Sequence, residues 1–250
     1  MKNFSETVVI IIQARMGSTR LPGKLLLEVA GRPLLSYQIE RLKRAKFADR
    51  IVVATTTNPR DEQIVDFCRK EKVSCYRGSE EDVLDRYERA AQEYGADIIV
   101  RITSDCPLID PAIVDQVIAY YFEHRDRFDY VSNTIQRTFP RGMDVEVFPY
   151  DKLEEIAARA VAPHEREHVT PYFYEHQDRY RLGSVSNDRD LSSYRWTVDT
   201  EEDFTLVSKI INALYRHKPN FTLDDLLNLF KKHPDWKNIN VHVKQKPLKT

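Results

Sequence analysis

Residues 13–24 combine three cations with two hydroxyl side chains and two glycines, and they contain no acid. The cations are Arg15, Arg20 and Lys24, and the segment directly follows an apolar run at residues 8–12. A buried strand that opens into a cationic, glycine-bearing loop is suited to holding polyanions. Arginine offers a planar fork that matches phosphate oxygens, whereas lysine acts as a point charge. The loop therefore predicts a site for a nucleoside triphosphate.

Two widespread phosphate-binding loops do not fit this segment. The P-loop places four residues between its first glycine and a Gly-Lys pair that Ser or Thr follows. Here five residues separate Gly17 from Gly23, and Leu25 follows Lys24. The pattern G-x-G-x-x-G is also absent from the segment. The remaining alternative is a solvated basic loop, but open α/β sheets bind their ligands at this carboxyl edge of the strands.

The string at residues 13–24 resembles the N-terminal signature of the cytidylyltransferases that activate sugars and sugar acids. That family includes 3-deoxy-manno-octulosonate cytidylyltransferase, and the resemblance is strongest to its spore-coat-polysaccharide, SpsF-like branch. It covers the chain to about Phe204. The resemblance implies catalytic roles for Arg15 and Lys24. It also implies that the nucleotide contacts in this string are Gln13, Ala14, Arg15, Met16, Gly17, Ser18, Arg20 and Lys24.

The reaction implied by this resemblance joins a sugar hydroxyl to the α-phosphate of CTP and releases pyrophosphate. Such an in-line displacement requires positioning and charge neutralisation, usually by cations and Mg²⁺. The expected cofactor is therefore Mg²⁺, and the expected substrates are CTP and a sugar or sugar acid. Carboxylates that hold the metal should lie at strand ends.

Asp105 is the first candidate metal ligand. A strand at residues 97–102 leads into the short polar loop that carries it, and a helix is expected to begin at Pro111. The family resemblance assigns Mg²⁺ binding to the aspartate before x-Pro-Leu-Ile, and hard oxygen ligands suit this ion. The alternative is a turn-forming aspartate before Pro107. Asp110 is interpreted as the helix N-cap.

Asp199 is the second candidate metal ligand. It follows a strand expected at residues 194–198, and the resemblance to a Val-Asp-Thr-x-Glu-Asp string implies that it completes the metal site. The following acids, residues 201–203, are instead expected to favour a helix N-terminal dipole. Thr200 would cap that helix, which leaves Asp199 as the ligand.

The resemblance places a pyrimidine-recognition loop at residues 77–86. Gly78 would let backbone groups approach the base, and Arg86 would face the nucleotide from a helix. Arg77 and Arg101 complete the expected nucleotide-binding set. The segment departs from the Ser-Gly-Thr-Asp-Arg-type string of the sugar-acid synthetases, and ordinary solvated charge is the alternative for Arg77 and Arg86.

Asp144 and Glu146 lie in a segment that resembles the Gly-x-Asp-x-Glu element contacting the incoming sugar. Strand alternation puts both side chains on one face, where they could bind sugar hydroxyls or assist deprotonation. The alternative is a solvent-facing edge strand.

His164 and His168 are four residues apart on an expected helix, which could mimic a zinc-binding pair. The segment from His164 to His168 has the spacing of the H-E-x-x-H zinc motif, but the family resemblance favours another role for it. The Arg-Glu-His-Val-Thr-Pro string implies instead that this segment contacts the acceptor or a second subunit. Plain helix surface is the alternative.

The composition is that of an ordinary soluble protein. Of 250 residues, 42% are hydrophobic and 31% charged, which suits one α/β domain at residues 1–250. The net charge of −1 argues against general nucleic-acid or membrane-surface binding. Three scattered cysteines match neither a disulfide framework nor a zinc pattern, and no apolar stretch approaches a membrane span. We expect a cytoplasmic protein.

The first half of the chain alternates strands and helices. This rhythm predicts a mixed, mostly parallel sheet with helices on both faces. Together with the resemblance it implies a Rossmann-like nucleotidyltransferase (GT-A-type) three-layer α/β fold. The expected strands are residues 7–13, 51–55, 73–76 and 97–102, and the expected helices are residues 33–46, 61–70, 82–94 and 111–124.

The second half elaborates the same fold with a different rhythm. The resemblance implies a nucleotide-binding half at about 1–127, a sugar-binding and dimerisation half at about 128–204, and C-terminal helices at about 200–250. It thereby implies a homodimer. The expected strands are residues 130–133, 144–148, 180–185 and 194–198, and the expected helices are residues 150–159, 163–176, 201–215 and 222–232.

Two other functions remain open at the level of sequence. A glycosyltransferase could use a finished nucleotide-sugar on the same fold, but it would usually carry an Asp-x-Asp motif, and Asp105 has no second acid at that spacing. A non-catalytic nucleotide sensor is disfavoured by the presence of both candidate metal aspartates.

Overall fold

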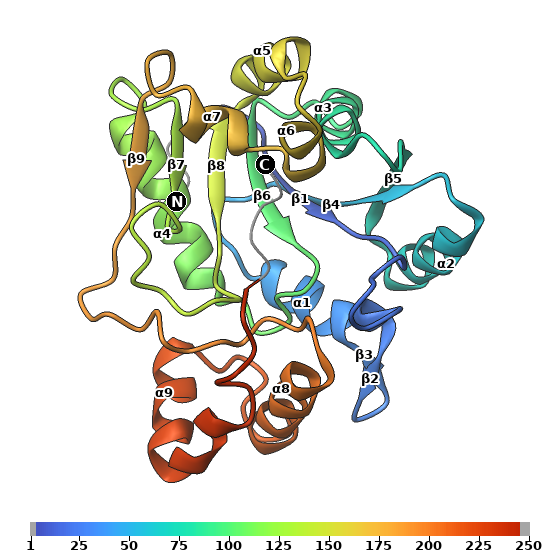
Figure 1. Cartoon of the computed structure of the whole chain (residues 1–250), viewed down its shortest axis with the longest axis vertical. Coiled ribbons are helices and arrows are strands. Elements are labelled where there is room, and N and C mark those ends of the chain that lie inside the picture. The colour runs from blue at the N-terminus through green and yellow to red at the C-terminus, as the bar shows by residue number, and fades with distance from the viewer. Residues whose placement is uncertain (1–3, 246–250) are drawn as a thin grey trace.

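A central sheet organises the molecule, of which a computed structural model describes residues 4–245. Within these residues seven strands form the sheet in the order β5-β4-β1-β6-β8-β7-β9 (Figure 1). Neighbours from β5 to β6 are parallel, whereas β8 is antiparallel to both β6 and β7. The mixed, mostly parallel sheet is thereby confirmed. The strands are β1 Val8–Gln13, β4 Arg50–Thr56, β5 Ser74–Gly78, β6 Ile98–Thr103, β7 Tyr130–Ser132, β8 Glu146–Pro149 and β9 Leu182–Ser184.

The central strand β1 shows why the sheet is covered on both faces. Val8, Ile10 and Ile12 belong to the apolar core on one face, and all three are fully buried. Val9 and Ile11 belong to the core on the other face and are equally buried. Because successive side chains of a strand point to opposite faces, a continuous apolar strand requires two covering layers.

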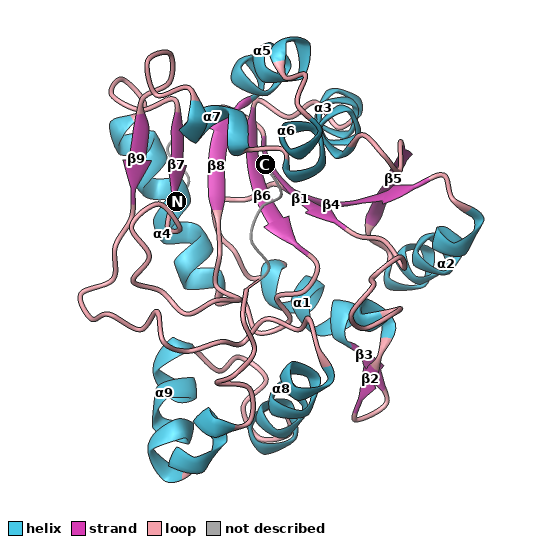
Figure 2. Cartoon of the chain, viewed as in Figure 1, coloured by secondary structure: helices cyan, strands magenta, loops and turns pink. Residues whose placement is uncertain are grey.

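Helices supply those two layers, as Figure 2 shows. One face is covered by α1 Leu34–Leu42, α2 Glu62–Glu71 and α4 Pro111–His124. The helices α8 Glu201–Leu214 and α9 Leu223–Lys232 add to the same apolar core from beyond the ends of the strands, at the bottom of Figure 2. The other face is covered by α3 Val83–Glu93, α5 Tyr150–Arg159 and α7 Pro171–Glu175, with α6 Pro163–His168 against α3. Among residues 4–245, no helix combines the length and apolarity that crossing a bilayer requires.

The single helix expected at residues 163–176 is wrong. The segment forms two short helices, α6 and α7, that are separated at Val169, whose φ is +72°. Val169 is the residue that leaves helical geometry, since Thr170 stays in the right-handed helical region. Pro171 lacks an amide hydrogen, so the hydrogen bonds of α6 cannot continue into α7. The break turns the chain between His168 and the start of α7.

The strand expected at residues 194–198 is also wrong. The segment forms one isolated bridge, from Arg195 to Arg141, and no ladder. The strand expected from Asp144 begins only at Glu146. Both segments therefore reach the site as irregular backbone, and particular contacts rather than sheet pairing fix their positions.

A small hairpin between β1 and α1 was not expected from the sequence. It pairs β2 Glu28–Val29 with β3 Arg32–Pro33 across a turn at Ala30 and Gly31. Both turn residues have positive φ, +49° and +75°, as a two-residue hairpin turn requires. Three short 3₁₀ helices complete the described elements: η1 Lys24–Leu26, η2 Pro59–Asp61 and η3 Pro234–Asn238.

Candidate active site

The cationic loop leaves the carboxyl end of β1 and is anchored by a buried aspartate. The Met16 amide donates to Oδ1 of Asp61 at 2.7 Å, and the Thr56 hydroxyl donates to the other carboxylate oxygen. Asp61 is only 2% exposed. The loop closes when the Gly23 amide donates to the Met16 carbonyl, with Gly23 at a φ of +65°. Glycine adopts this left-handed conformation without the penalty that a Cβ would bring.

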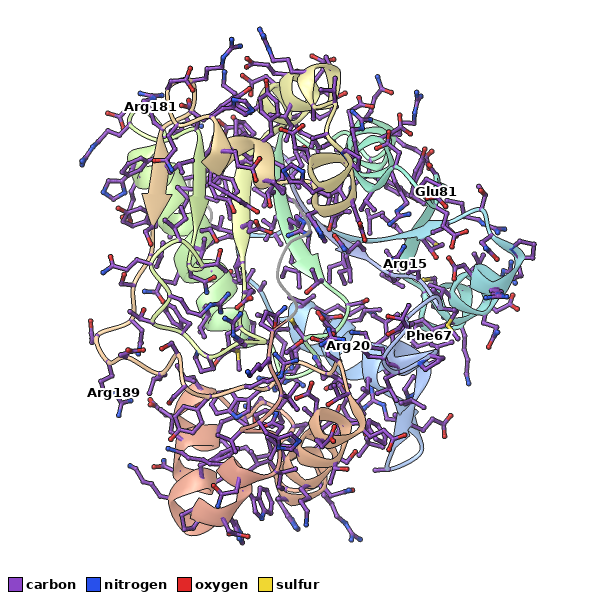
Figure 3. The ribbon with its side chains drawn as sticks, viewed as in Figure 1. Arg15, Arg20, Phe67, Glu81, Arg181 and Arg189 are labelled. Atoms are coloured by element: carbon purple, nitrogen blue, oxygen red, sulfur yellow. The ribbon has the colours of Figure 1, made fainter. Side chains whose placement is uncertain are left out.

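The loop lines a cavity of about 360 Å³. Figure 3 labels Arg15 and Arg20, which this loop contributes. The floor and far wall come from the end of β6, from α3 and from α6. The lining residues are Gln13, Ala14, Arg15, Gly17, Ser18, Thr19, Arg20, Lys24, Val83, Arg86, Thr103, Ser104, Asp105, Glu167 and His168.

Lys24 joins the two candidate metal aspartates. Its Nζ lies 2.8 Å from Oδ1 of Asp199 and 3.5 Å from Oδ2 of Asp105, and it also donates to the Val198 carbonyl at 2.7 Å. Burial alone would lower the pKa of Lys24, but the two carboxylates raise it above its ordinary value of 10.5. The ammonium therefore stays charged and bridges both acids.

Asp105 is held ionised beside this ammonium. Burial acts to raise its pKa, but the charge of Lys24 and a hydrogen bond from the Thr103 hydroxyl lower the pKa below its ordinary value of 3.8. The adjacent Cys106 is buried, and burial together with the charge of Asp105 raises the pKa of its thiol. Cys106 is therefore a neutral neighbour and no nucleophile.

Asp199 reaches the site through backbone bonds to the Asp105 loop. The Val198 amide donates to the Asp105 carbonyl at 2.8 Å, and the Thr197 hydroxyl donates to the same oxygen at 3.1 Å. Asp199 is surrounded by cations, because Arg195 lies 2.8 Å and Arg20 3.0 Å from its Oδ2. Its carboxylate thus gathers three positive side chains when Lys24 is included.

Arg195 is itself fixed by a buried acid. Its guanidinium makes two 2.9 Å hydrogen bonds to Asp203, which is fully buried. Thr200 caps α8 as expected, with its hydroxyl accepting from the Asp203 amide. Asp203 therefore does more than favour the helix dipole: it aims Arg195 at Asp199.

The donor set at this point suits Mg²⁺. Two carboxylates from different segments, Asp105 and Asp199, converge on one positive group, and each presents an oxygen to it. Mg²⁺ is usually bound by one or two carboxylates together with waters and substrate phosphates. The position of the Lys24 ammonium shows that the two acids can share a cation.

A second cavity of about 590 Å³ adjoins the first, and Thr103 and His168 line both. It lies along β6, β8 and α7. The residues that line it are Arg101, Thr103, Thr134, Ile135, Arg137, Arg141, Asp144, Glu146, His168, Thr170, Tyr174, Gln177, Leu182 and Gln245. Thr103 and His168 therefore mark the junction of the two cavities.

Two candidate acceptor residues line this second cavity but are already engaged. Asp144 accepts two hydrogen bonds from Arg137, at 2.6 and 2.9 Å. Glu146 pairs with Arg101 through one oxygen. Both groups are therefore held in fixed positions by neighbouring side chains.

The other oxygen of Glu146 accepts from the Tyr130 hydroxyl at 2.5 Å and from the Thr170 hydroxyl at 2.7 Å. Arg101 donates onward to the side-chain oxygen of Gln13 at 3.0 Å. Because Gln13 lines the first cavity and Glu146 the second, this buried chain of hydrogen bonds connects the two.

Arg141 differs from the other arginines of the second cavity. No ion pair or side-chain hydrogen bond engages its guanidinium within residues 4–245, whereas Arg101 and Arg137 are both paired with acids. Burial lowers the pKa of Arg141, and the nearby charges of Arg137 and Arg195 act in the same direction. The charge of Asp144 acts in the opposite direction, but Asp144 pairs with Arg137, so among the described residues Arg141 is the arginine of this cavity without an ion pair.

Arg86, in the first cavity, also forms no ion pair with an acid among the described residues. It is 1% exposed, its Nε has no hydrogen-bond partner among the described residues, and burial lowers its pKa. Gly78 makes room for it: a Cβ there would lie 2.8 Å from Tyr76 and 3.0 Å from the Arg86 side chain. The sequence anticipated both residues, but the structure gives Gly78 a packing role.

The structure brings most of the anticipated nucleotide set together, with four exceptions. Arg77 pairs with Glu62 at 2.7 Å and lies outside the first cavity, as do Gly78 and Met16. Arg101 lines the second cavity instead. Of the two histidines, His168 lines both cavities, whereas His164 lines neither and bonds to Glu175.

Several residues of the site were not anticipated. Asp61 anchors the loop across 45 positions, and no sequence signal identifies it. Glu167 lies 3.8 Å from Arg15 across the first cavity, within the acidic and basic run that the sequence does show. Arg195 could have been suspected, because it precedes Asp199 by four residues.

The fold and site define a nucleotide-binding α/β protein whose cationic loop faces paired carboxylates. A family model described as cytidylyltransferase matches residues 9–236. An uncharacterised protein of Methanocaldococcus jannaschii is 39% identical over 243 residues, which cover 96% of each chain. The spore coat polysaccharide biosynthesis protein SpsF of Bacillus subtilis is 33% identical over 238 residues, 91% of this chain and 95% of SpsF.

A solved structure agrees with these relationships. A cytidylyltransferase from Leptospira borgpetersenii superimposes with a TM-score of 0.89 at 39% identity, covering 97% of this chain and 100% of that one. The chain therefore belongs to the cytidylyltransferase family and is a nucleotidyltransferase.

Proposed function

We propose that this enzyme couples CTP to a sugar or sugar acid in a Mg²⁺-dependent reaction that yields a CMP-sugar and pyrophosphate. The observation that carries the proposal is the convergence of Arg20 and Lys24 with Asp105 and Asp199 at the end of the central strands. Arg15 lines the same cavity. Cations for a triphosphate and carboxylates for a divalent metal therefore share one site.

The nucleotide occupies the first cavity in this proposal. The loop amides and the side chains of Arg15, Arg20 and Lys24 hold the triphosphate, whose negative charge replaces the acids that now engage these cations. Gln13 and Arg86 line the wall available to the rest of the nucleotide. The partnerless Nε of Arg86 supports a contact there, because a buried donor without an acceptor is costly.

Asp105 and Asp199 are the residues that would hold Mg²⁺. Bound there, the ion would neutralise charge that develops on the phosphates. Lys24 contacts both acids in this structure, so we infer that it exchanges them for phosphate oxygens when the metal nucleotide arrives. Arg195 keeps its contacts to Asp203 and continues to orient Asp199.

The acceptor occupies the second cavity in this proposal. Its hydroxyl oxygen forms a bond to the α-phosphorus, the bond to the bridging oxygen breaks, and pyrophosphate leaves with that electron pair. Thr103 and His168 line the junction that this hydroxyl must reach. We propose that His168 accepts the proton of this hydroxyl as the new bond forms. Arg141, which makes no ion pair among the described residues, supports an acceptor that carries an anionic group, such as a sugar acid.

The biological setting follows the Bacillus relative in this proposal. SpsF is named for spore coat polysaccharide biosynthesis. We propose that the CMP-sugar made here likewise supplies a polysaccharide, and that the enzyme works as a cytoplasmic homodimer. Sedimentation velocity at micromolar concentration would test the dimer, and a monomer throughout would contradict it.

The deciding experiment has two parts. Thermal unfolding with CTP, UTP, GTP and ATP, each with Mg²⁺, should show a CTP-selective rise. A ligand at about 100 times its Kd adds about 2.7 kcal/mol, or about 5–10 °C for a domain of this size. Pyrophosphate release is then measured with CTP and a panel of neutral sugars and sugar acids. Sugar transfer from a finished nucleotide-sugar without pyrophosphate release would overturn the proposal.

A further inference from the structure

Four metal-ligating side chains gather where α6 meets α7, outside the two cavities that the reaction uses. Figure 1 shows these two short helices side by side above β6 and β8. His164, Glu165 and Glu175 place their ligand atoms within 4.8 Å of one another. His176 adds a fourth, with its Nε2 3.5 Å from Oε1 of Glu165. We propose that this cluster is a binding site for a transition-metal dication of the Zn²⁺ type.

The spacing of the ligand atoms fits such an ion. Nε2 of His164 lies 3.1 and 2.9 Å from the two oxygens of Glu175. Zn²⁺ binds imidazole nitrogen and carboxylate oxygen at about 2.0–2.2 Å, which puts the ligands of a tetrahedron about 3.4 Å apart. Nε2 of His176 lies 3.5 Å from Oε1 of Glu165. The His164–Glu175 and His176–Glu165 spacings therefore fit a tetrahedral site, and side-chain rotations would bring the two pairs together around one ion.

The two carboxylates of the cluster would be stabilised by a bound cation. Glu165 is only 5% exposed, and within residues 4–245 no lysine or arginine pairs with it or with Glu175. The two carboxylates therefore face two imidazoles, and these nitrogen and oxygen atoms are ligands that Zn²⁺ takes. Burying a carboxylate without a positive partner is unfavourable, and a dication would neutralise both acids at once.

Neighbouring groups already hold the ligands in position. Oε2 of Glu165 accepts from the backbone amides of Val161 and Ala162, at 3.1 and 2.9 Å, which leaves Oε1 directed at His176. The His176 ring packs on Tyr172 with a centroid distance of 4.0 Å. Outer contacts of this kind orient metal ligands and are part of a functional site.

This site differs from the histidine pair that the sequence suggested. His168 lines the reaction cavities, and His164 instead meets residues of α7 and its C-terminal end. A metal here would join α6 to α7, and α6 carries Glu167 and His168 to the active site. The role that follows is structural: the ion fixes the helix that presents these two residues.

The test uses the purified, metal-free full-length chain and Co²⁺ as a spectroscopic probe. Tetrahedral coordination by nitrogen and oxygen should give visible d–d bands at one equivalent, and Zn²⁺ should abolish them and raise the melting temperature. His164→Ala and His176→Ala should each weaken Co²⁺ binding by about 10-fold to 100-fold. Glu175→Gln, at a half-exposed position, provides a ligand variant that is expected to fold normally.

Two controls separate this site from other places where Co²⁺ could bind. Asp105→Asn should leave the bands intact, because it alters only the active-site carboxylates. His217→Ala removes an exposed imidazole elsewhere and should also leave them intact. Absent bands in the wild type, or bands that persist in His164→Ala and in Glu175→Gln, would overturn the proposal.

Discussion

The Nζ atom of Lys24 lies 2.8 Å from Oδ1 of Asp199, although 175 positions separate the two residues. The contact joins the phosphate-binding loop to the segment before α8, and the same ammonium reaches Asp105. A cation from one end of the chain thus holds together two acids from other segments. The first three predictions concern members of this trio.

Replacing Lys24 with alanine should lower turnover by at least about 100-fold, the scale of losing a charge partner in the transition state. The measurement is pyrophosphate release at saturating CTP, accompanied by the CTP-dependent shift in melting temperature. Lys43→Ala, an exposed lysine at the end of α1, is the matched control and should be silent. Near-normal turnover in Lys24→Ala would remove this residue from the catalytic set.

The variant Asp105→Asn should also lose at least about 100-fold in turnover while it keeps its fold. The amide preserves the size of the side chain but removes the charge that a metal needs. Steady-state rates over a Mg²⁺ titration would measure the effect. Asp178→Asn, whose side chain is 77% exposed, is the control. If Asp105→Asn retained wild-type rates, the metal assignment would fail.

The ionised state of Asp105 should appear in the pH dependence of stability. Its pKa lies below the ordinary value of 3.8 in the folded protein, so the unfolded chain binds its proton first as the pH falls. The resulting stability is present above about pH 4 and is lost as the pH drops through the folded pKa. Melting temperatures from pH 7 to pH 3 should therefore fall less steeply in Asp105→Asn than in the wild type. Equal slopes would contradict the assignment.

The buried pair of Arg101 and Glu146 should be costly to break. Both side chains are about one-tenth exposed, so Glu146→Leu leaves an uncompensated guanidinium and should destabilise the fold by about 3–5 kcal/mol. The double variant Arg101→Met/Glu146→Leu should recover much of this loss. Denaturant unfolding measures both. A single variant no less stable than the double would show that the two charges are not coupled.

Gly142 should not tolerate a side chain. Its φ is +99°, and a Cβ would lie 2.7 Å from the Thr197 amide nitrogen and 2.7 Å from the Trp196 carbonyl carbon. Gly142→Ala should therefore cost more than the about 1–3 kcal/mol of a strained conformation alone. Gly31→Ala is the matched control, since its φ is +75° but open space surrounds it. Equal losses in the two variants would mean that the contact with the 196–197 backbone does not matter.

Much of this molecule follows from local sequence. Short-range patterns predict the apolar run of β1, the alternation of strands and helices to Thr103, and the helix caps Asp110 and Thr200. The structure confirms all of these. The cationic loop could be recognised because its composition is unusual over twelve residues. Local periodicity and capping act within a few residues, so a single sequence is enough to read them.

The three-dimensional arrangement of the site was decided by contacts between distant segments. Residues 194–198 look like a strand, yet they dock as irregular backbone because Val198 and Thr197 bond to the Asp105 carbonyl. Asp61 anchors the phosphate loop from another strand end. Such positions depend on hydrogen bonds across 45 to 175 residues, and no local pattern encodes which donor meets which acceptor. The sequence thus predicted which kinds of side chain the site contains, and the fold determined which residues meet there.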